Sequence, residues 1–297
     1  MSLDSAVVSL ILITLFAATV NGALGYGFSS LTVPVALLSY TNRVLNPALV
    51  LVEVVVNSYV LFINRDSIPR VWRRVLPIAI GLIPGIVIGS FVLSYVHPGA
   101  IKIVTYAVIL PFILLQAAGF RRYIQAERTV GLPFGTGLGV LYSVTTISGP
   151  PLALLFNNQG FVRQEFRAGL ALIRIVESTA TAIAYYFLGL YSLASGQILL
   201  WIIPSVLIGI PFGAFLIRRI EPEVFRRVCM SFDAWVVGFG LSRTLIELGL
   251  LESPTAYLAL VAAAVIDMWL LYRFFTRRSR ARASGELGEL APSLIGH

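Results

Sequence analysis

The sequence predicts an all-α protein that crosses a membrane several times and consists of two related halves of opposite orientation. Three observations predict this: the composition, a series of apolar segments separated by short arginine-rich loops, and rare residues that recur about 124 positions apart. Of 297 residues, 58% are hydrophobic and 12% are charged, whereas an ordinary soluble domain is about half apolar and about a quarter charged. A lipid bilayer is therefore the natural solvent, and we expect no separate soluble domain.

The apolar segments fall into two kinds. A helix needs about 20 apolar residues to span a bilayer, and the uninterrupted segments of that length are 44–64, 75–95, 99–119, 167–189, 197–217, 223–242 and 255–275. Two further regions, 5–40 and 129–158, are equally apolar but contain glycines or prolines near the middle. We expect each to be a hairpin of two short helices joined inside the membrane.

These segments define the expected organisation. The first repeat covers 1–120, a cytoplasmic linker 121–128, and the second repeat 129–244. Each repeat would contain one hairpin and three spanning helices. An extra span at 255–275 would follow, and then a polar tail at 276–297 that we expect to be disordered.

Loop charge predicts the orientation, because short cytoplasmic loops are rich in lysine and arginine. The arginine-rich segments, which we place inside, are 65–74, 120–128, 218–227 and 273–282. The segments 97–100 and 191–196 carry no lysine or arginine, and we place them outside. The C-terminus would then be cytoplasmic and the N-terminus outside. Both ends of 129–158 fall on the inside, so this region must turn back on itself.

The internal repeat depends on polar and helix-breaking residues. An offset of 124 pairs Gly25 with Gly149, Arg43 with Arg167, Glu53 with Glu177, Gly85 with Gly209, Gly89 with Gly213 and Pro98 with Pro222. The arginine-rich loop 65–74 then aligns with the uncharged segment 189–198, so the halves have opposite topology. Inverted repeats with broken helices are typical of secondary transporters.

Several function classes are disfavoured by the residues present. The net charge of +8 comes from arginines beside apolar segments, where they contact lipid headgroups, so we do not expect nucleic-acid binding. Cys229 is the only cysteine, and His97 and His297 are the only histidines, so we expect no disulfide, metal site or cofactor. No serine-histidine or paired-aspartate set lies within the spans, so we do not expect an enzyme.

The first candidate site is the stretch Asn21-Gly-Ala-Leu-Gly-Tyr-Gly-Phe-Ser-Ser30. Its glycines permit backbone conformations that interrupt a helix. A new helix that begins near Phe28 would present its first N–H groups and the positive end of its dipole to an anion. The candidate substrate-binding residues here are Asn21, Gly22, Gly25, Tyr26, Gly27 and Ser29. The alternative is close helix packing through small residues.

The second candidate site is Thr145-Thr-Ile-Ser-Gly-Pro-Pro-Leu152. Proline at the first helical positions has a suitable φ and removes an N–H group that would lack a partner, so a helix should begin here. The candidate substrate-binding residues are Thr145, Thr146, Ser148, Gly149 and Pro150. The alternative is a simple kink or the end of an ordinary span.

A third group consists of charges inside the spans. Glu53 and Glu177 lie near the middle of predicted spans, where ionisable residues are usually functional. Glu53 shares a helix face with Asn57, and Glu177 shares one with Arg174. Arg174 and Glu177 could form an ion pair, which would be a structural role. Because Glu53 has no partner on its own helix, we expect it to be the better candidate for a proton-binding group.

The glycine-rich first hairpin, the Ser-Gly-Pro-Pro turn about 124 residues later and the surrounding spans resemble the TauE/SafE sulfite exporter family. The resemblance covers nearly the whole chain. It implies movement of sulfite, sulfoacetate or related sulfur oxyanions and organosulfonates across a prokaryotic plasma membrane. It also implies that residues 25–29 and 148–151 border the substrate site.

The leading functional hypothesis is a secondary transporter that exports a small anion by alternating access, with protons as one candidate coupling ion. The expected partners are the anion and the lipid bilayer. One alternative is a transporter for a different small anion, and another is a helical membrane scaffold or sensor in which the hairpins only pack. The sequence leaves the exact substrate, the direction, the coupling ion and the oligomeric state open.

Overall fold

The computed structural model describes residues 5–118, 127–157, 163–217, 219 and 221–283. Helices make up nearly all of this part of the chain, and it contains no strand. The α-helices of the first half are α1 (Ser5–Leu24), α2 (Phe28–Ala36), α3 (Asn42–Ile63), α4 (Ile68–Tyr95) and α5 (Pro98–Ala117). Those that follow are α6 (Glu127–Thr145), α7 (Gly149–Asn157), α8 (Arg163–Phe187), α9 (Leu193–Leu216), α10 (Pro222–Glu247) and α11 (Leu258–Ala283). Short 3-10 turns, η1 (Arg65–Ser67) and η2 (Thr255–Tyr257), precede α4 and α11.

Seven helical segments of the described chain are long and apolar enough to cross a membrane. Six are predicted spans, and the seventh is α1, whose 20 residues make the first arm of its hairpin longer than expected. Helix α10 has 26 residues but is not among the seven, because its charged residues lower its hydropathy. The fold is thus a polytopic helical membrane protein, as the sequence predicts.

The two helix breaks lie where the sequence places them, between α1 and α2 and between α6 and α7. The end of the chain differs from the prediction, because α11 continues to Ala283 and so includes the first eight residues of the expected tail. The expected linker 121–128 and the rest of the tail lie almost wholly outside the described residues.

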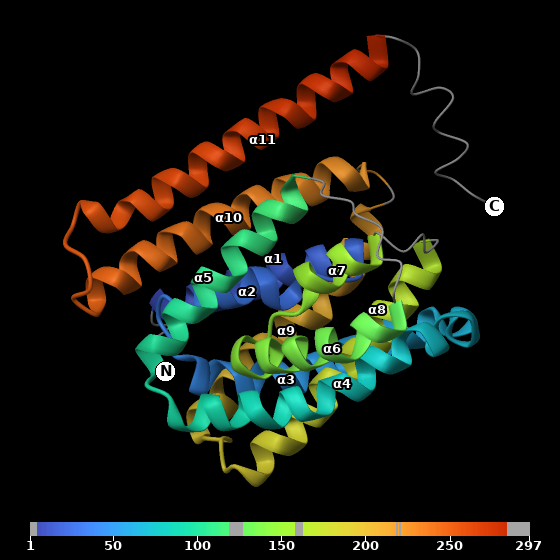
Figure 1. Cartoon of the computed structure of the whole chain (residues 1–297), viewed down its shortest axis with the longest axis horizontal. Coiled ribbons are helices and arrows are strands. Elements are labelled where there is room, and N and C mark those ends of the chain that lie inside the picture. Colours follow the sequence, from blue (N-terminus) through green and yellow to red (C-terminus); the bar gives the residue numbers. More distant parts are fainter. Residues whose placement is uncertain (1–4, 119–126, 158–162, 218, 220, 284–297) are drawn as a thin grey trace.

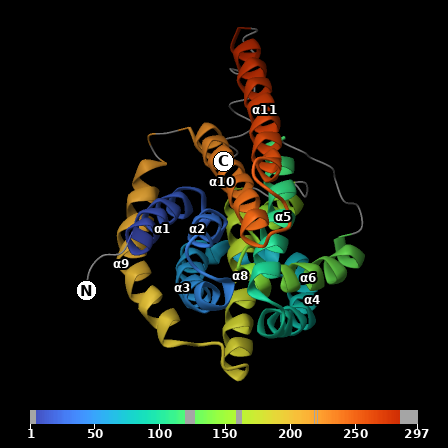
Figure 2. The ribbon, with the colours of Figure 1, turned by 90° about the vertical axis from the view of Figure 1, so that its left-hand side faces the viewer.

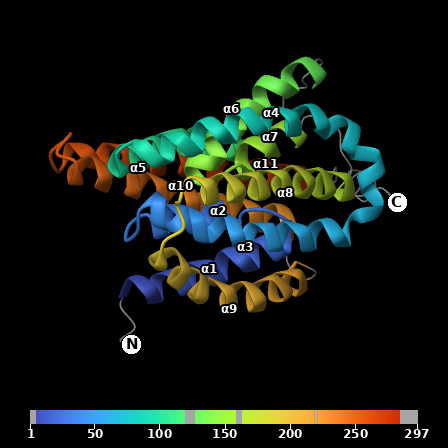
Figure 3. The ribbon, with the colours of Figure 1, turned by 90° about the horizontal axis from the view of Figure 1, so that it is seen from below.

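The helices run roughly side by side (Figure 3). Helices α1 and α9 form one flank and α4 and α6 the opposite flank, with α2, α3 and α8 between them (Figures 1 and 2). Helices α5 and α10 pack against each other, and α11 lies on the outside against α10. Many large hydrophobic side chains on the outer faces are exposed, as expected of surfaces that face lipid.

The packing between the halves is reciprocal. Helix α4 lies along α6 of the other half, and α9 lies along α1 in the same way. Helix α10 contacts α2 and α5 contacts α7, while the repeat partners α3 and α8 pack on each other. This pattern fits two equivalent halves; their opposite orientation in the membrane stays a prediction.

Glycines permit the close approach on both flanks. A Cβ atom added at Gly85 would lie 2.1 Å from the carbonyl oxygen of Thr136, and one at Gly213 would lie 1.8 Å from that of Thr19. Any larger residue would therefore force α4 from α6 or α9 from α1, so both glycines serve the packing of helices.

Candidate functional site

The first break consists of Gly25, Tyr26 and Gly27. Gly25 and Gly27 have φ values of 84° and 105°, a region that favours glycine because it has no Cβ atom. The N–H group of Gly25 donates to the carbonyl oxygen of Asn21 at 2.7 Å and closes α1, and Phe28 begins α2. Gly27 supplies no side-chain cap, so the first N–H groups of α2 have no intrahelical partner and can bind another acceptor.

The second break has a different local chemistry. Thr146 has a φ of 57°, which is unfavourable for a β-branched residue by roughly 1–2 kcal/mol. The hydroxyl of Thr145 accepts from the N–H group of Ile147 at 3.0 Å, and the side chains of Asn42 and Asn46 donate to the carbonyl oxygen of Val144 at 3.3 and 2.7 Å. These contacts satisfy backbone groups in and after the last turn of α6, so the helix can end there, and α7 begins at Gly149.

Arginines at repeat-related positions cap neighbouring helices. Arg43 donates to the carbonyl oxygens of Leu93 and Ser94 at the end of α4, at 2.8 and 2.5 Å. Arg167 donates to the carbonyl oxygen of Ala23 at the end of α1, at 2.7 Å, and its side chain also lies against Gly25. These arginines therefore compensate C-terminal carbonyls that lack helical partners.

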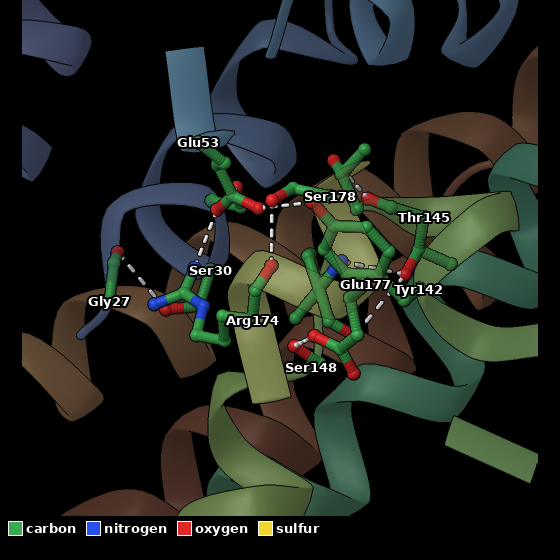
Figure 4. Close-up of polar contacts among 12 residues, drawn as sticks. Gly27, Ser30, Glu53, Tyr142, Thr145, Ser148, Arg174, Glu177 and Ser178 are labelled. Carbon is green, nitrogen blue, oxygen red and sulfur yellow. Dashed lines mark hydrogen bonds and ion pairs between the residues drawn. The ribbon is translucent and has the colours of Figure 1, made fainter. Parts of the chain in front are cut away.

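Glu53 is the centre of a buried polar cluster that joins both breaks (Figure 4). One of its carboxylate oxygens accepts from the Ser29 hydroxyl at 2.5 Å and from Arg174 Nη2 at 2.5 Å. The other accepts from the hydroxyl of Tyr142 at 2.5 Å. All four side chains are buried, so the cluster ties α2, α3, α6 and α8 together away from water.

The ion pair that the sequence allows between Arg174 and Glu177 is not formed. Helices α3 and α8 pack on each other, so the guanidinium of Arg174 reaches across to Glu53 and forms its ion pair there. Glu177 accepts from the Ser148 hydroxyl at 2.6 Å, and its Oε1 has no hydrogen-bond partner in the described structure. Glu53 has no ion-pair partner on its own helix among the described residues, but Arg174 of α8 supplies one, which removes the reason to prefer Glu53 as a proton-binding group.

A cavity lies between the two breaks, beside this cluster. The first break supplies Tyr26 and Gly27, while Ser30 lies in the first turn of α2 and Pro150 in the first turn of α7. The remaining lining residues come from α1, α2, α5 and α10: Val20, Leu24, Leu31, Ile113, Gln116, Arg226, Cys229, Met230 and Asp233. The cavity therefore meets the N-terminus of α2, where the sequence places a candidate anion site, and that role stays a prediction. The cavity also has one positive and one acidic side chain that the sequence did not assign to it.

Two polar groups at the cavity lack hydrogen-bond partners. Gln116 on α5 and Asp233 on α10 are each 6% exposed. Neither Gln116 Nε2 nor Asp233 Oδ1 has a partner among the described residues. An unsatisfied buried donor costs about 1–3 kcal/mol, so a ligand that accepts from Gln116 would recover that free energy.

The predicted substrate-binding residues separate into three groups. Tyr26, Gly27 and Pro150 line the cavity, and Gly149 lies next to Tyr26. The hydroxyl groups of Ser29, Ser148, Thr145 and Thr146 already donate to carboxylates or backbone carbonyls. Asn21, Gly22 and Gly25 lie outside the lining of this cavity, as does Asn57, which was predicted to lie beside Glu53 and not to bind substrate.

Gly22 has a packing role in the structure. A Cβ atom there would lie 2.2 Å from the carbonyl oxygen of Ile210 on α9, so the alternative of close packing accounts for this glycine. Asn21 and Asn57 are both 2% exposed, and one amide atom of each lacks a partner in the described structure.

Sequence reasoning did not assign four side chains to the site: Arg226, Gln116, Asp233 and Tyr142. Arg226 was counted only as a loop charge, although it shares a face of α10 with Asp233 seven residues later. Gln116 is a polar residue inside an apolar span, which is a detectable signal. Tyr142 carries no such signal, because tyrosine is common in membrane helices and only the packing of α6 brings its hydroxyl to Glu53.

The fold and the site together define a polytopic helical membrane protein with two helix breaks beside a mostly apolar cavity that contains Arg226, Gln116 and Asp233. The family model for "Sulfite exporter TauE/SafE" matches residues 10–241, and the chain belongs to this family of transporters. The probable sulfite/organosulfonate exporter TauE of Cupriavidus necator is 30% identical over 176 residues, which cover 58% of this chain and 67% of that protein. No solved structure matches the chain.

Proposed function

We propose that the protein is a secondary transporter that exports a small sulfur oxyanion or organosulfonate across the inner membrane of a bacterium. Membership of the TauE/SafE family and the likeness to a probable sulfite/organosulfonate exporter support this class of substrate. The single observation that carries the proposal is the cavity between the two breaks, where Arg226 and the unpartnered amide of Gln116 meet the N-terminus of α2.

The cavity offers three kinds of contact that suit a sulfonate or sulfite group. The guanidinium of Arg226 supplies positive charge and a donor geometry that matches oxyanions. Gln116 Nε2 and the first N–H groups of α2 supply neutral donors, and the dipole of α2 favours negative charge. Apolar side chains such as Leu24 and Ile113 complete the lining of the cavity, whose volume in this structure is about 20 Å³. An organosulfonate would therefore bind only in a state in which the helices around the cavity have moved apart.

The polar cluster around Glu53 is a candidate pivot for motion of the two halves relative to each other. Glu53 belongs to the first half and Arg174 to the second, and their ion pair is the buried charged contact between repeat-related helices. If the halves rock around the anion, as inverted-repeat transporters do, the contact between α3 and α8 lies near the pivot. The predicted loop orientation places the Arg226 end of the cavity toward the cytoplasm, from which an exported anion would enter.

Flux measurements in proteoliposomes test the proposal. Vesicles loaded with sulfite should release it faster with the protein than without it, and Arg226→Gln should raise the KM about 10- to 100-fold, because a hydrogen bond to a charged group contributes about 1.5–3 kcal/mol. Arg243→Gln is the matched control, since Arg243 lies on the same helix but is exposed and paired with Glu247. This variant should transport like the unchanged protein.

Two outcomes would count against the proposal. If sulfite and a panel of sulfonates all fail to move while another small anion is carried, the substrate class is wrong and the site is a more general anion site. If no anion binds or moves, and the protein forms stable cross-linked oligomers, the scaffold or sensor alternative is favoured.

A further inference from the structure

Asp233 is the acidic side chain of the proposed substrate cavity. It lies on α10, seven residues and so about 10 Å along the axis from Arg226. Its side chain is buried, and its Oδ1 has no hydrogen-bond partner in the part of the chain that the structure describes. The same part of the chain contains no ion pair to Asp233.

The other buried acidic side chains have different surroundings. Glu53 is paired with Arg174, and Asp267 is paired with Arg227. Glu177 forms no ion pair within the described residues but accepts from the Ser148 hydroxyl. Asp233 has neither kind of contact within the described residues, so no fixed group stabilises its ionised form.

The titratable and charged groups that face Asp233 come from two elements. Helix α10 itself contributes Arg226 and Cys229, and the first break contributes Tyr26. The lining residues on α5 and α7 are neutral, as are those on α1 and α2. Arg226 is therefore the positive charge of the cavity, and it lies at the far end of the α10 face from Asp233.

We propose that the cavity binds a proton on Asp233 together with the anion, so that the transporter carries one proton with each anion. The proposal rests on the anion site described above. An ionised Asp233 would repel an anion in the same cavity, whereas a protonated Asp233 is neutral and can donate a hydrogen bond to it. Arg226 and a protonated Asp233 give the cavity one net positive charge, which a singly charged sulfonate neutralises.

This arrangement has two measurable consequences. Where Asp233 is ionised in the empty protein, binding of each anion takes up one proton, so affinity falls about tenfold per pH unit as the pH rises. A singly charged anion that moves with one proton also carries no net charge. Its flux should then be independent of the membrane potential.

Methanesulfonate is the appropriate probe, because a sulfonic acid is fully ionised throughout the pH range of the experiment. Sulfite would confuse the result, since it changes its own charge near neutral pH. Isothermal titration calorimetry of the purified full chain, in buffers of different ionisation enthalpy, counts the protons taken up per anion. We expect a value that approaches one on the alkaline side, and a value of zero at every pH would overturn the proposal without any variant.

Variants then assign the proton to a residue. Asp233→Asn should bind methanesulfonate with little dependence on pH, while Glu177→Gln, which changes a second buried acid without a cation, should retain the tenfold slope. The proposal is overturned if Asp233→Asn keeps the slope or if Glu177→Gln removes it.

Flux under an imposed potential gives an independent readout. In vesicles clamped with potassium and valinomycin, the unchanged protein should move methanesulfonate at the same rate at all potentials. Asp233→Asn should become sensitive to the potential, because the anion then moves alone. If methanesulfonate binds but its flux in the unchanged protein depends on the membrane potential, proton coupling is overturned and the proposed anion transporter stands. Failure to bind sulfite or methanesulfonate at any pH would overturn the proposed function itself.

Discussion

The ion pair between Glu53 and Arg174 allows a quantitative test of how the two halves are held together. The pair is buried, with side-chain exposures of 1% and 2%, and its N–O distance is 2.5 Å. Arg174→Gln leaves the Glu53 carboxylate with two neutral donors, Ser29 and Tyr142. Glu53→Gln leaves the guanidinium of Arg174 without a counter-charge.

The expected loss of stability follows from the burial of the pair. Removal of one partner from a buried ion pair costs about 3–5 kcal/mol, because the remaining charge is uncompensated. The guanidinium has little else to compensate for this loss, since its Nε and Nη1 already lack partners in the described structure. At about 2 °C per kcal/mol for a long chain, each single variant should unfold about 6–10 °C lower. The double variant Glu53→Gln/Arg174→Gln has no buried charge, so it should recover at least half of the loss.

Loss of helical circular dichroism supplies the assay, and a thermal scan at a fixed rate compares the variants. A thiol-reactive dye is unsuitable, because the buried Cys229 lines the proposed substrate cavity and could react in the folded protein. Arg243→Gln is the control, because the Arg243–Glu247 pair is 56% and 44% exposed and such pairs contribute at most about 1 kcal/mol. Additive losses in the double variant, or an Arg174→Gln protein as stable as the unchanged one, would refute the reasoning.

Two further predictions concern packing away from the cavity. Gly85→Ala should destabilise the α4–α6 contact by about 1–3 kcal/mol or more, because the new Cβ atom would lie 2.1 Å from the Thr136 carbonyl oxygen; Gly137→Ala, which meets nothing within 4 Å, should be neutral or stabilising in the same thermal scan. Asp267→Asn should leave Arg227 buried without its partner and increase hydrogen exchange in α11, and unchanged exchange there would contradict the assigned role of this pair.

The membrane class and the helix breaks were accessible from the sequence for a physical reason. A span must contain about 20 apolar residues, and its backbone N–H and C=O groups must form their hydrogen bonds within the protein. Composition and length alone therefore indicate where helices lie. Glycines at 25 and 27, and the Ser148-Gly149-Pro150-Pro151 turn, then indicate breaks, because these residues alter backbone freedom locally. The structure has breaks at both places.

Other local rules were less reliable. The length of α1 exceeds what a hairpin of two short helices requires, since nothing before Gly22 interrupts its hydrogen bonding. The i to i+3 spacing of Arg174 and Glu177 allowed an ion pair but did not require one. The arginine side chain is long enough to reach a carboxylate on a neighbouring helix as well as one on its own helix, so helix packing determines which of them it pairs with.

By itself the sequence determined that this chain is a helical membrane protein and where its helices break, because both depend on residues close together in the chain. Only the tertiary structure decided that Arg174 pairs with Glu53 and that Tyr142 donates a hydrogen bond to the same carboxylate. It also decided that Arg226, Gln116 and Asp233 line one cavity next to both breaks. These contacts join residues from separate helices. They depend on how the helices pack and rotate against one another, and hydropathy and local spacing do not contain that information.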